Sequence, residues 1–207
     1  MATGISSSGD YIYKPVAKRA GWGKVLDVGC GQGVILSRLK SEGRELYGFD
    51  IAPAAVRLAK TMNTDRNFFA ADAQNMPLKS NTFDCIVCTE LIEHIEGDRA
   101  VRECYRVLKP NGVALFTAPN KSGAGNGYQA AHVHSFTFKS FASFLEQAGF
   151  EVICGYKLGL YIPILSHLLE VASLALRRNL PLAGPLNIEV PEFLATNFLI
   201  ECRKPPI

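Results

Sequence analysis

The sequence predicts an α/β fold built on a parallel β-sheet, and three observations support this prediction. Short apolar runs alternate with segments of helical periodicity from residue 24 to residue 148. The first run leads into a glycine-rich stretch, VLDVGCGQG at residues 25–33, and the second run ends at an acid, Asp50. Strands that alternate with helices are typical of parallel sheets whose connections are right-handed crossovers.

Apolar runs bounded by turn residues predict the strands. KVLDVGC ends in glycines and is predicted to be a buried strand, and ELYGFDI and FDCIVCT have the same apolar character. The predicted strands cover residues 24–30, 45–51, 67–73, 83–89, 113–119, 151–158 and 196–204.

Segments with helical spacing of apolar residues fill the gaps between these strands. Pro53 suits the first position of a helix, and Gly43 and Gly149 are placed where helices commonly end. The Pro-Asn-Gly sequence at 110–112 provides another stop signal. The predicted helices cover residues 34–43, 53–62, 99–112 and 139–148.

Three segments depart from the alternation, within what we interpret as one domain over residues 1–207. Residues 1–21 form an N-terminal segment that begins with ten small and polar residues, which we expect to be loose and which do not resemble a signal peptide. Residues 120–134 are rich in Gly, Asn and Ser at their start and predict a mobile loop. Residues 156–191 are apolar and predict a helical cap before the last strand; Glu170 within them argues against a transmembrane helix.

Composition narrows the class of protein. The 207 residues carry a net charge of only +3 and contain 48% hydrophobic and 20% charged residues, which argues against a disordered chain and against a nucleic-acid-binding protein. The six cysteines are scattered through apolar segments and predict reduced, buried thiols of a cytoplasmic protein. Cys85 and Cys88 form a CxxC motif, but on a strand their sulfurs would point to opposite faces, so we expect neither a zinc nor a redox site.

The glycine-rich stretch and the acids near it predict a nucleoside-containing cofactor. Glycines permit positive φ and let a ligand approach the backbone. Asp50 lies about twenty residues beyond the first glycine, where an acid can accept hydrogen bonds from both hydroxyls of a ribose. The GxGxG spacing differs from the GxGxxG of dinucleotide-binding proteins, and a third acid, Asp72, ends the third predicted strand.

Four segments together resemble the class I S-adenosylmethionine-dependent methyltransferases: VLDVGCGQG, Asp50, AADAQNMPLKSNTFDCIVCTELIEHI and ECYRVLKPNGVALFTAPN. The nearest likeness is to the small-molecule branch, methyltransferase type 11, which includes ubiquinone-pathway O-methyltransferases. The resemblance covers roughly residues 22–150, with the four segments in the family's order and spacing. It implies a Rossmann-like, seven-stranded, mostly parallel sheet with helices on both faces and an antiparallel last strand, and it implies S-adenosyl-L-methionine as the cofactor.

The same resemblance implies roles for individual residues at the cofactor. Asp27 would orient the loop and approach the methionine amino group, Asp50 would bind the ribose, and Asp72 would read the edge of the adenine. The implied cofactor-binding residues are Asp27, Gly29, Cys30, Gly31, Gly33, Asp50, Ile51, Asp72, Ala73, Thr89 and Glu90.

The stretch TELIEHI raises the question of catalysis. Glu90, Glu93 and His94 are spaced so that they would share one face of a helix. Histidine is the natural proton acceptor near neutral pH, and His94, His132 and His134 are our catalytic candidates. The stretch also resembles the ExxEH segment of methyltransferases that use a divalent ion, including RNA 2′-O-methyltransferases. We favour a pocket wall that does acid/base work without a metal ion.

The predicted function is therefore methyl transfer to a small apolar or aromatic molecule, including a lipid-like one, with oxygen as the expected acceptor atom. Two alternatives stay open: a metal-dependent RNA 2′-O-methyltransferase, and a non-catalytic regulatory protein that binds the cofactor. We expect a monomer or a homodimer, and the sequence identifies neither the acceptor nor the oligomeric state.

Overall fold

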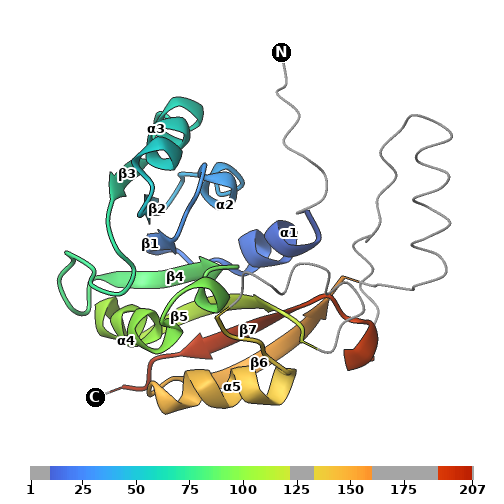
Figure 1. The fold of residues 1–207 in the computed structure, drawn as a ribbon. Helices are drawn as coiled ribbons and strands as arrows, with labels where there is room; N and C mark the ends of the chain where they lie inside the picture. The colour runs from blue at the N-terminus through green and yellow to red at the C-terminus, as the bar shows by residue number, and fades with distance from the viewer. Residues whose placement is uncertain (1–9, 122–132, 160–190, 207) are drawn as a thin grey trace, which may run out of the picture.

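The computed structural model describes residues 10–121, 133–159 and 191–206, and these residues form one seven-stranded sheet (Figure 1). The strand order is β3-β2-β1-β4-β5-β7-β6, and β7 is antiparallel to both of its neighbours while the other pairs are parallel. The predicted fold class, with its antiparallel last strand, is confirmed. The strands are β1 Gly23–Val28, β2 Arg44–Asp50, β3 Asn67–Ala70, β4 Phe83–Thr89, β5 Leu108–Pro119, β6 Glu151–Leu158 and β7 Asn197–Arg203.

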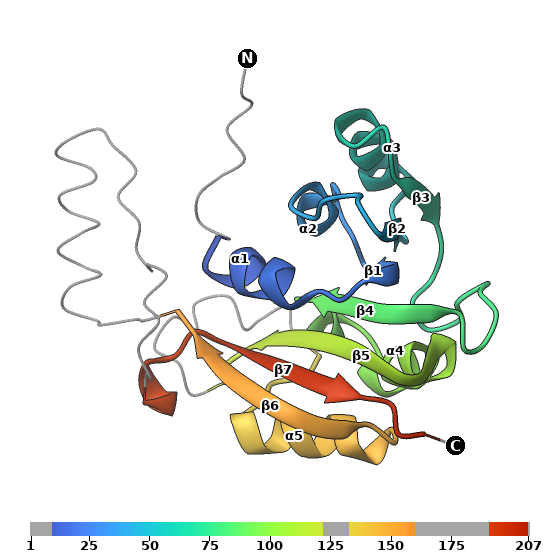
Figure 2. The same ribbon diagram turned by 180° about the vertical axis from the view of Figure 1, so that it is seen from behind.

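Helices cover both faces of the sheet. In Figures 1 and 2, α1, α2 and α3 lie on one side of the strands, and α4 and α5 lie on the other side. Buried apolar side chains form a separate cluster on each face, because alternate residues of a strand point in opposite directions. The helices are α1 Asp10–Arg19, α2 Val34–Ser37, α3 Pro53–Met62, α4 Gly97–Val107 and α5 Phe138–Gln147.

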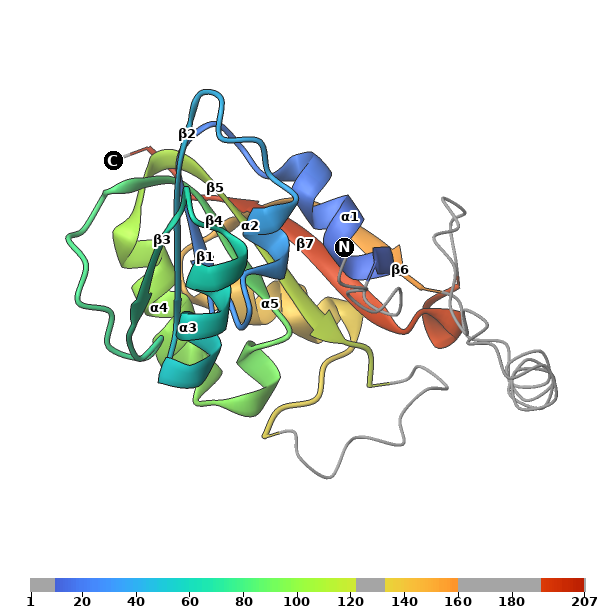
Figure 3. The same ribbon diagram turned by 90° about the horizontal axis from the view of Figure 1, so that it is seen from above.

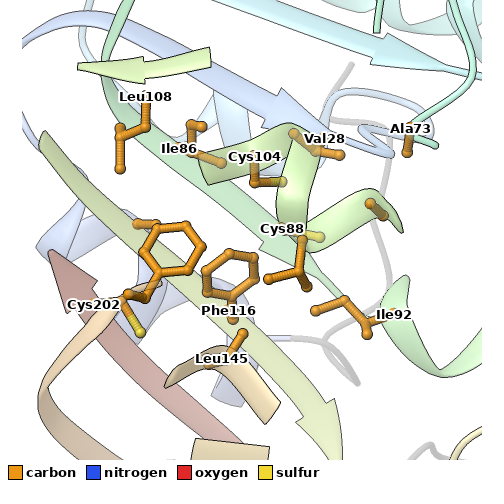
Figure 4. Close-up of a cluster of buried hydrophobic side chains, with 14 of the residues drawn as sticks. Val28, Ala73, Ile86, Cys88, Ile92, Cys104, Leu108, Phe116, Leu145 and Cys202 are labelled. Carbon is orange, nitrogen blue, oxygen red and sulfur yellow. The ribbon is translucent and has the colours of Figure 1, made fainter. Parts of the chain in front are cut away.

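The larger cluster joins α4 and α5 to the sheet around Phe116 and Leu145 (Figure 4). Cys88 belongs to this cluster, whereas Cys85 belongs to the cluster on the opposite face, as the strand prediction required. All six cysteines are free thiols, and all except the half-buried Cys154 are buried. Across the ranges described above, no helix has the length and hydropathy needed to span a bilayer.

Three element predictions are corrected. The predicted helix over 34–43 is only the four-residue α2, and the predicted strand over 67–73 ends at Ala70. The predicted helix over 99–112 ends at Val107, because Leu108 already pairs with Phe83 of β4 as the first residue of β5.

The N-terminal segment contains a helix that the sequence did not indicate. α1 has Pro15 in its interior and buries only Ile12 and Val16, so its apolar stripe is short. It packs against α2, β5 and β7, and Figure 3 shows it beside α2. Three parts of the predicted segments lie outside the described residues: the first nine residues, residues 122–132 of the expected loop over 120–134, and residues 160–190 of the expected cap over 156–191.

Candidate cofactor site

The candidate site lies at the edge of the sheet where the parallel strands β1, β2, β4 and β5 end. In the sheet, β1 lies between β2 and β4. From β1 the chain moves outward in one direction, to β2 and then β3, and from β4 it moves outward in the opposite direction, to β5. Open α/β sheets bind ligands at such a switch point. Because β7 is antiparallel, its first residue, Asn197, lies at the same edge, paired with Pro119 at the end of β5.

The glycine-rich loop is held close to β2. The backbone N–H of Cys30 donates to the carbonyl of Phe49 at 2.8 Å, and the backbone N–H of Gly31 donates to Asp50 Oδ2 at 3.0 Å. Gly29, Gly31 and Gly33 all have positive φ, between 50° and 77°. The loop is therefore fixed in a conformation that residues other than glycine adopt only with strain.

The three glycines have different surroundings. A Cβ on Gly29 would lie 2.9 Å from Leu91, and a Cβ on Gly33 would lie 2.9 Å from both Asn63 and Phe68. A Cβ on Gly31 would have no atom within 4 Å. Gly29 and Gly33 are thus required by packing inside the protein, whereas Gly31 leaves open space into which a ligand can fit.

Asp50 organises the loop as well as facing the site. Its Oδ1 accepts from the backbone N–H of Ala52 at 2.9 Å, while its Oδ2 accepts from Gly31. Each oxygen has a second lone pair that can accept from a ribose hydroxyl. The next residue, Ile51, has a side chain that is 71% exposed, which suits an apolar surface against which an aromatic ring can pack.

Asp27, in the interior of β1, has a side chain without a hydrogen-bond partner among the described residues. The residue is only 1% exposed, and neither carboxyl oxygen accepts a hydrogen bond within the described residues. Burial, and then the negative charge of Asp50, raises the pKa of Asp27 to about 7. A buried carboxyl without a partner is unfavourable, and a ligand ammonium group would supply both a charge and donors. The residues present therefore fit S-adenosylmethionine, whose methionine part carries such an amino group.

Asp72 and Ala73 follow β3 rather than belonging to it. Asp72 Oδ1 accepts from the backbone N–H of Gln74 at 2.8 Å, which closes a tight turn. Ala73 is buried against the core cluster shown in Figure 4. The Asp72 carboxylate thus has one oxygen in the turn and the other available to a ligand.

The turn after β4 differs most from the sequence prediction. Glu90 has a φ of 51°, and only Ile92–His94 form a short 3₁₀ helix. Glu90, Glu93 and His94 therefore do not share a helix face, and that premise was wrong. The Glu90 carboxylate is held from two strands: Thr117 Oγ1 donates to Oε1 at 2.8 Å, and Asn197 Nδ2 donates to Oε2 at 2.7 Å. Burial nevertheless raises the pKa of Glu90 to about 7.

Glu93 is a second buried acid at this turn. It is 1% exposed, and its Oε2 accepts no hydrogen bond from the part of the chain that the structure describes. Burial together with Glu90 raises its pKa to about 8. Its carbonyl accepts from the backbone N–H groups of Val133 and His134, which brings His134 to the same turn as His94. His94 Nε2 lies 3.8 Å from Glu93 Oε1, and its side chain is 45% exposed.

The structure thus places the predicted residues, except His132, around one edge of the sheet; His132 lies outside the described residues. Within residues 10–121, 133–159 and 191–206, no three His, Cys, Asp or Glu side chains converge as they would around a metal ion. Sequence reasoning missed Thr117 and Asn197. Both are polar residues at the carboxyl-edge ends of apolar strands, which is the signal that could have indicated them.

The chain is similar to known methyltransferases. Residues 26–116 match the model of the methyltransferase domain family. A Mycolicibacterium smegmatis protein described as a probable S-adenosylmethionine-dependent methyltransferase is 28% identical over 148 residues, which are 69% of this chain and 58% of that protein. A ubiquinone biosynthesis O-methyltransferase of Pseudomonas fluorescens is 33% identical over 108 residues, which are 48% of this chain and 45% of that protein. The chain thus spans about half the length of these relatives.

Solved structures share the fold at lower identity. The [4+2]-cyclase SpnF has a TM-score of 0.70 and 24% identity, with 100% of this chain and 85% of that chain covered. A SAM-dependent methyltransferase from Thermotoga maritima has a TM-score of 0.70 and 17% identity, with 94% of this chain and 88% of that chain covered. One fold therefore accompanies two differently named activities, so it does not by itself identify the reaction.

Proposed function

We propose that this chain, whose residues 26–116 match the methyltransferase domain family, is an S-adenosylmethionine-dependent methyltransferase that methylates a hydroxyl oxygen of a small apolar or aromatic molecule. Two observations carry the cofactor assignment: the buried carboxyl of Asp27, which has no hydrogen-bond partner among the described residues, and the open space at Gly31. The distant likeness to ubiquinone biosynthesis O-methyltransferases supports oxygen as the acceptor atom.

Each part of the cofactor has a proposed partner in this chain. Asp27 binds the ammonium group, Asp50 accepts from the ribose hydroxyls, and the exposed Ile51 packs on the adenine. Asp72 accepts from the adenine amino group with its second oxygen. S-adenosylmethionine, when bound, supplies a methyl group on a sulfonium, so the donor is already activated.

The protein then has to orient the acceptor and remove its proton. His94 is our first candidate for the base, because its partly exposed ring lies at the end of β4 beside the buried Glu93. As the methyl group moves to the acceptor oxygen, the hydroxyl proton passes to the imidazole. His134, held at the same turn, is the second candidate, and its ring lies near the rings of Phe136 and Phe144, with centroids 6.1 and 6.2 Å away.

Exposed apolar side chains near this edge support an apolar acceptor. Val133 is 65% exposed and adjoins His134, and Phe193 is 63% exposed. Phe193 lies on a 3₁₀ turn whose Glu192 carbonyl accepts from Asn120 Nδ2, directly after β5. Large exposed apolar side chains that adjoin a polar site are typical of ligand-binding surfaces.

The direct test is transfer of labelled methyl from S-adenosylmethionine into fractionated cell extract, with chelator and again with added Mg²⁺ or Mn²⁺. Label in the small-molecule fraction that persists with chelator supports the proposal. Label in RNA would replace the proposal with the RNA 2′-O-methyltransferase alternative. Label that appears only with added metal would make Glu90, Glu93 and His94 candidate metal ligands. A protein that binds S-adenosylhomocysteine but labels no fraction would favour the non-catalytic alternative.

His94→Gln is expected to lower kcat by about 100-fold or more, because an amide cannot accept the hydroxyl proton. The affinity for S-adenosylhomocysteine should stay within about twofold, since His94 is assigned to the acceptor side of the site. Steady-state kinetics and titration calorimetry measure the two quantities, and His134→Gln is the comparison. Equal losses in both variants would point to packing at this turn rather than to one base.

A further inference from the structure

The first turn of α1 connects two separate sides of the candidate site. Asp10 Oδ1 pairs with Arg38 at 2.6 Å, next to the end of α2. The hydroxyl of Tyr11 donates to Asn197 Oδ1 at 2.9 Å, at the start of β7. The helix α1 packs against both α2 and β7. The helix therefore spans from the glycine-rich loop and its helix to the side of the site that holds Glu90.

The side chain of Asn197 makes two hydrogen bonds, one to α1 and one to Glu90. It is 5% exposed, its Oδ1 accepts from Tyr11, and its Nδ2 donates to Glu90 Oε2. The Glu90 carboxylate can only accept hydrogen bonds, so the Asn197 NH2 group has to face it. The Asn197 carbonyl oxygen then faces Tyr11, whose hydroxyl donates to it. Exchanging the amide's oxygen and nitrogen would place oxygen against the carboxylate of Glu90.

Thr117 completes the arrangement on the other carboxyl oxygen. Its Oγ1 donates to Glu90 Oε1 at 2.8 Å and accepts from the backbone N–H of Glu90 at 3.2 Å. The Thr117 hydroxyl thereby bridges the side chain and the backbone of Glu90, whose φ is 51°. A hydrogen-bonded chain thus runs from Tyr11 through Asn197 and Glu90 to Thr117.

We propose that Asn197 is a positioning residue that couples α1 to the cofactor site, with its carbonyl holding Tyr11 and its amide holding Glu90. Tyr11 is the matching positioning residue on the helix. This inference rests on the proposed function, because it assigns α1 the task of covering S-adenosylmethionine. When α1 is docked, Asn197 fixes the Glu90 carboxylate; when α1 leaves, the Asn197 carbonyl loses its partner.

The test uses Tyr11→Phe, Asn197→Leu and the double variant in the full chain. S-adenosylhomocysteine affinity is measured by calorimetry, and hydrogen exchange of the α1 amides is measured without ligand. Tyr11→Phe should weaken binding about fivefold and speed α1 exchange about fivefold, as expected for one lost hydrogen bond. Asn197→Leu should weaken binding about 30-fold, because a bond to a charged group is also lost.

The double variant distinguishes coupling from two independent effects. If Tyr11 acts through Asn197, the double variant should match Asn197→Leu within about twofold in both measurements. Tyr156→Phe is the control, since it deletes a tyrosine hydroxyl under the other end of α1, where Arg19 stacks on the ring at 3.8 Å. It should change neither measurement by more than about twofold.

The outcomes separate this inference from the proposed function. Suppose that the wild type binds S-adenosylhomocysteine but the losses of affinity in the double variant are additive, or that Tyr11→Phe and Tyr156→Phe lose equal affinity. Either result would overturn the role of Asn197 and leave the proposed function standing. Failure of the wild-type protein to bind S-adenosylhomocysteine would overturn both. If Asn197→Leu does not fold, the comparison of Tyr11→Phe with Tyr156→Phe decides the question.

Discussion

Asp27→Asn is expected to weaken S-adenosylhomocysteine binding by about 100-fold or more and, at pH about 8, to raise the melting temperature of the unliganded protein. The two effects have one cause, because the buried carboxylate is unfavourable without a partner and favourable with an ammonium group. Calorimetry of binding and thermal unfolding measure them separately. An ordinary structural acid would show loss of stability instead.

The pH dependence follows from the direction of the pKa shift. Asp27 has a pKa of about 7 in the folded protein, above its value in the unfolded chain. The protonated form therefore stabilises the fold below the unfolded pKa of about 4, and this contribution is lost as the pH rises through about 7. Glu90 and Glu93 shift in the same direction. The melting temperature of the wild type should fall between pH about 5 and pH about 8, and the melting temperature of Asp27→Asn should fall less over the same range.

Asp84→Asn is the control with the opposite sign. Asp84 lies on β4, at the far end from the site, and accepts from Lys109 Nζ at 2.7 Å and from the backbone N–H of Lys24 at 2.9 Å. These donors outweigh its burial and lower the pKa of Asp84. Its replacement should lower the melting temperature at neutral pH and leave ligand binding unchanged. A stabilising effect of Asp84→Asn would contradict our explanation that Asp27→Asn stabilises the protein by removing a buried carboxylate without a partner.

Gly31→Ala is expected to affect mainly ligand binding, whereas Gly33→Ala is expected to affect mainly the stability of the fold. Both glycines have positive φ, so both substitutions carry a similar backbone strain of about 1 kcal/mol. The new Cβ at Gly31 enters open space, whereas at Gly33 it meets Asn63 and Phe68 at 2.9 Å. We expect Gly31→Ala to weaken S-adenosylhomocysteine binding about 30-fold through exclusion of the ligand. Gly33→Ala should destabilise the fold by about 1–3 kcal/mol more than Gly31→Ala does.

Urea unfolding and calorimetry of the same two variants give the comparison. The difference between the effects of Gly31→Ala and Gly33→Ala cancels the backbone strain that both substitutions introduce. What remains reports the different surroundings of the two new Cβ atoms. If Gly31→Ala binds as well as the wild type while Gly33→Ala does not, the ligand approaches the loop from the other side.

The sequence was sufficient where local signals and the core agree. Apolar runs bounded by turns predicted β4 and β6 with the bounds that the structure has, Phe83–Thr89 and Glu151–Leu158. The glycine-rich turn and Asp50 were recognised because their spacing along the chain reflects one βα unit. These features depend on residues that are close together in sequence.

The features that sequence reasoning missed depend on distant residues. Glu90 adopts its left-handed conformation because Thr117 and Asn197 hold it, at separations of 27 and 107 residues. TELIEHI has helical spacing, yet these tertiary bonds prevent the helix. α1 was missed because Pro15 and a short apolar stripe weaken its local signal, while Arg38 and Asn197 hold it from outside.

The position of β7 sets an order of events during protein synthesis. β7 lies between β5 and β6, although both neighbours precede it in the chain. Until residues 197–203 emerge from the ribosome, β6 has no strand beside it in the sheet and β5 exposes one edge. Glu90 also lacks Asn197 until that moment. The newly made chain therefore acquires its last sheet pairings and its finished site in one late step, and ribosome-bound chains that stop before residue 197 should bind no cofactor.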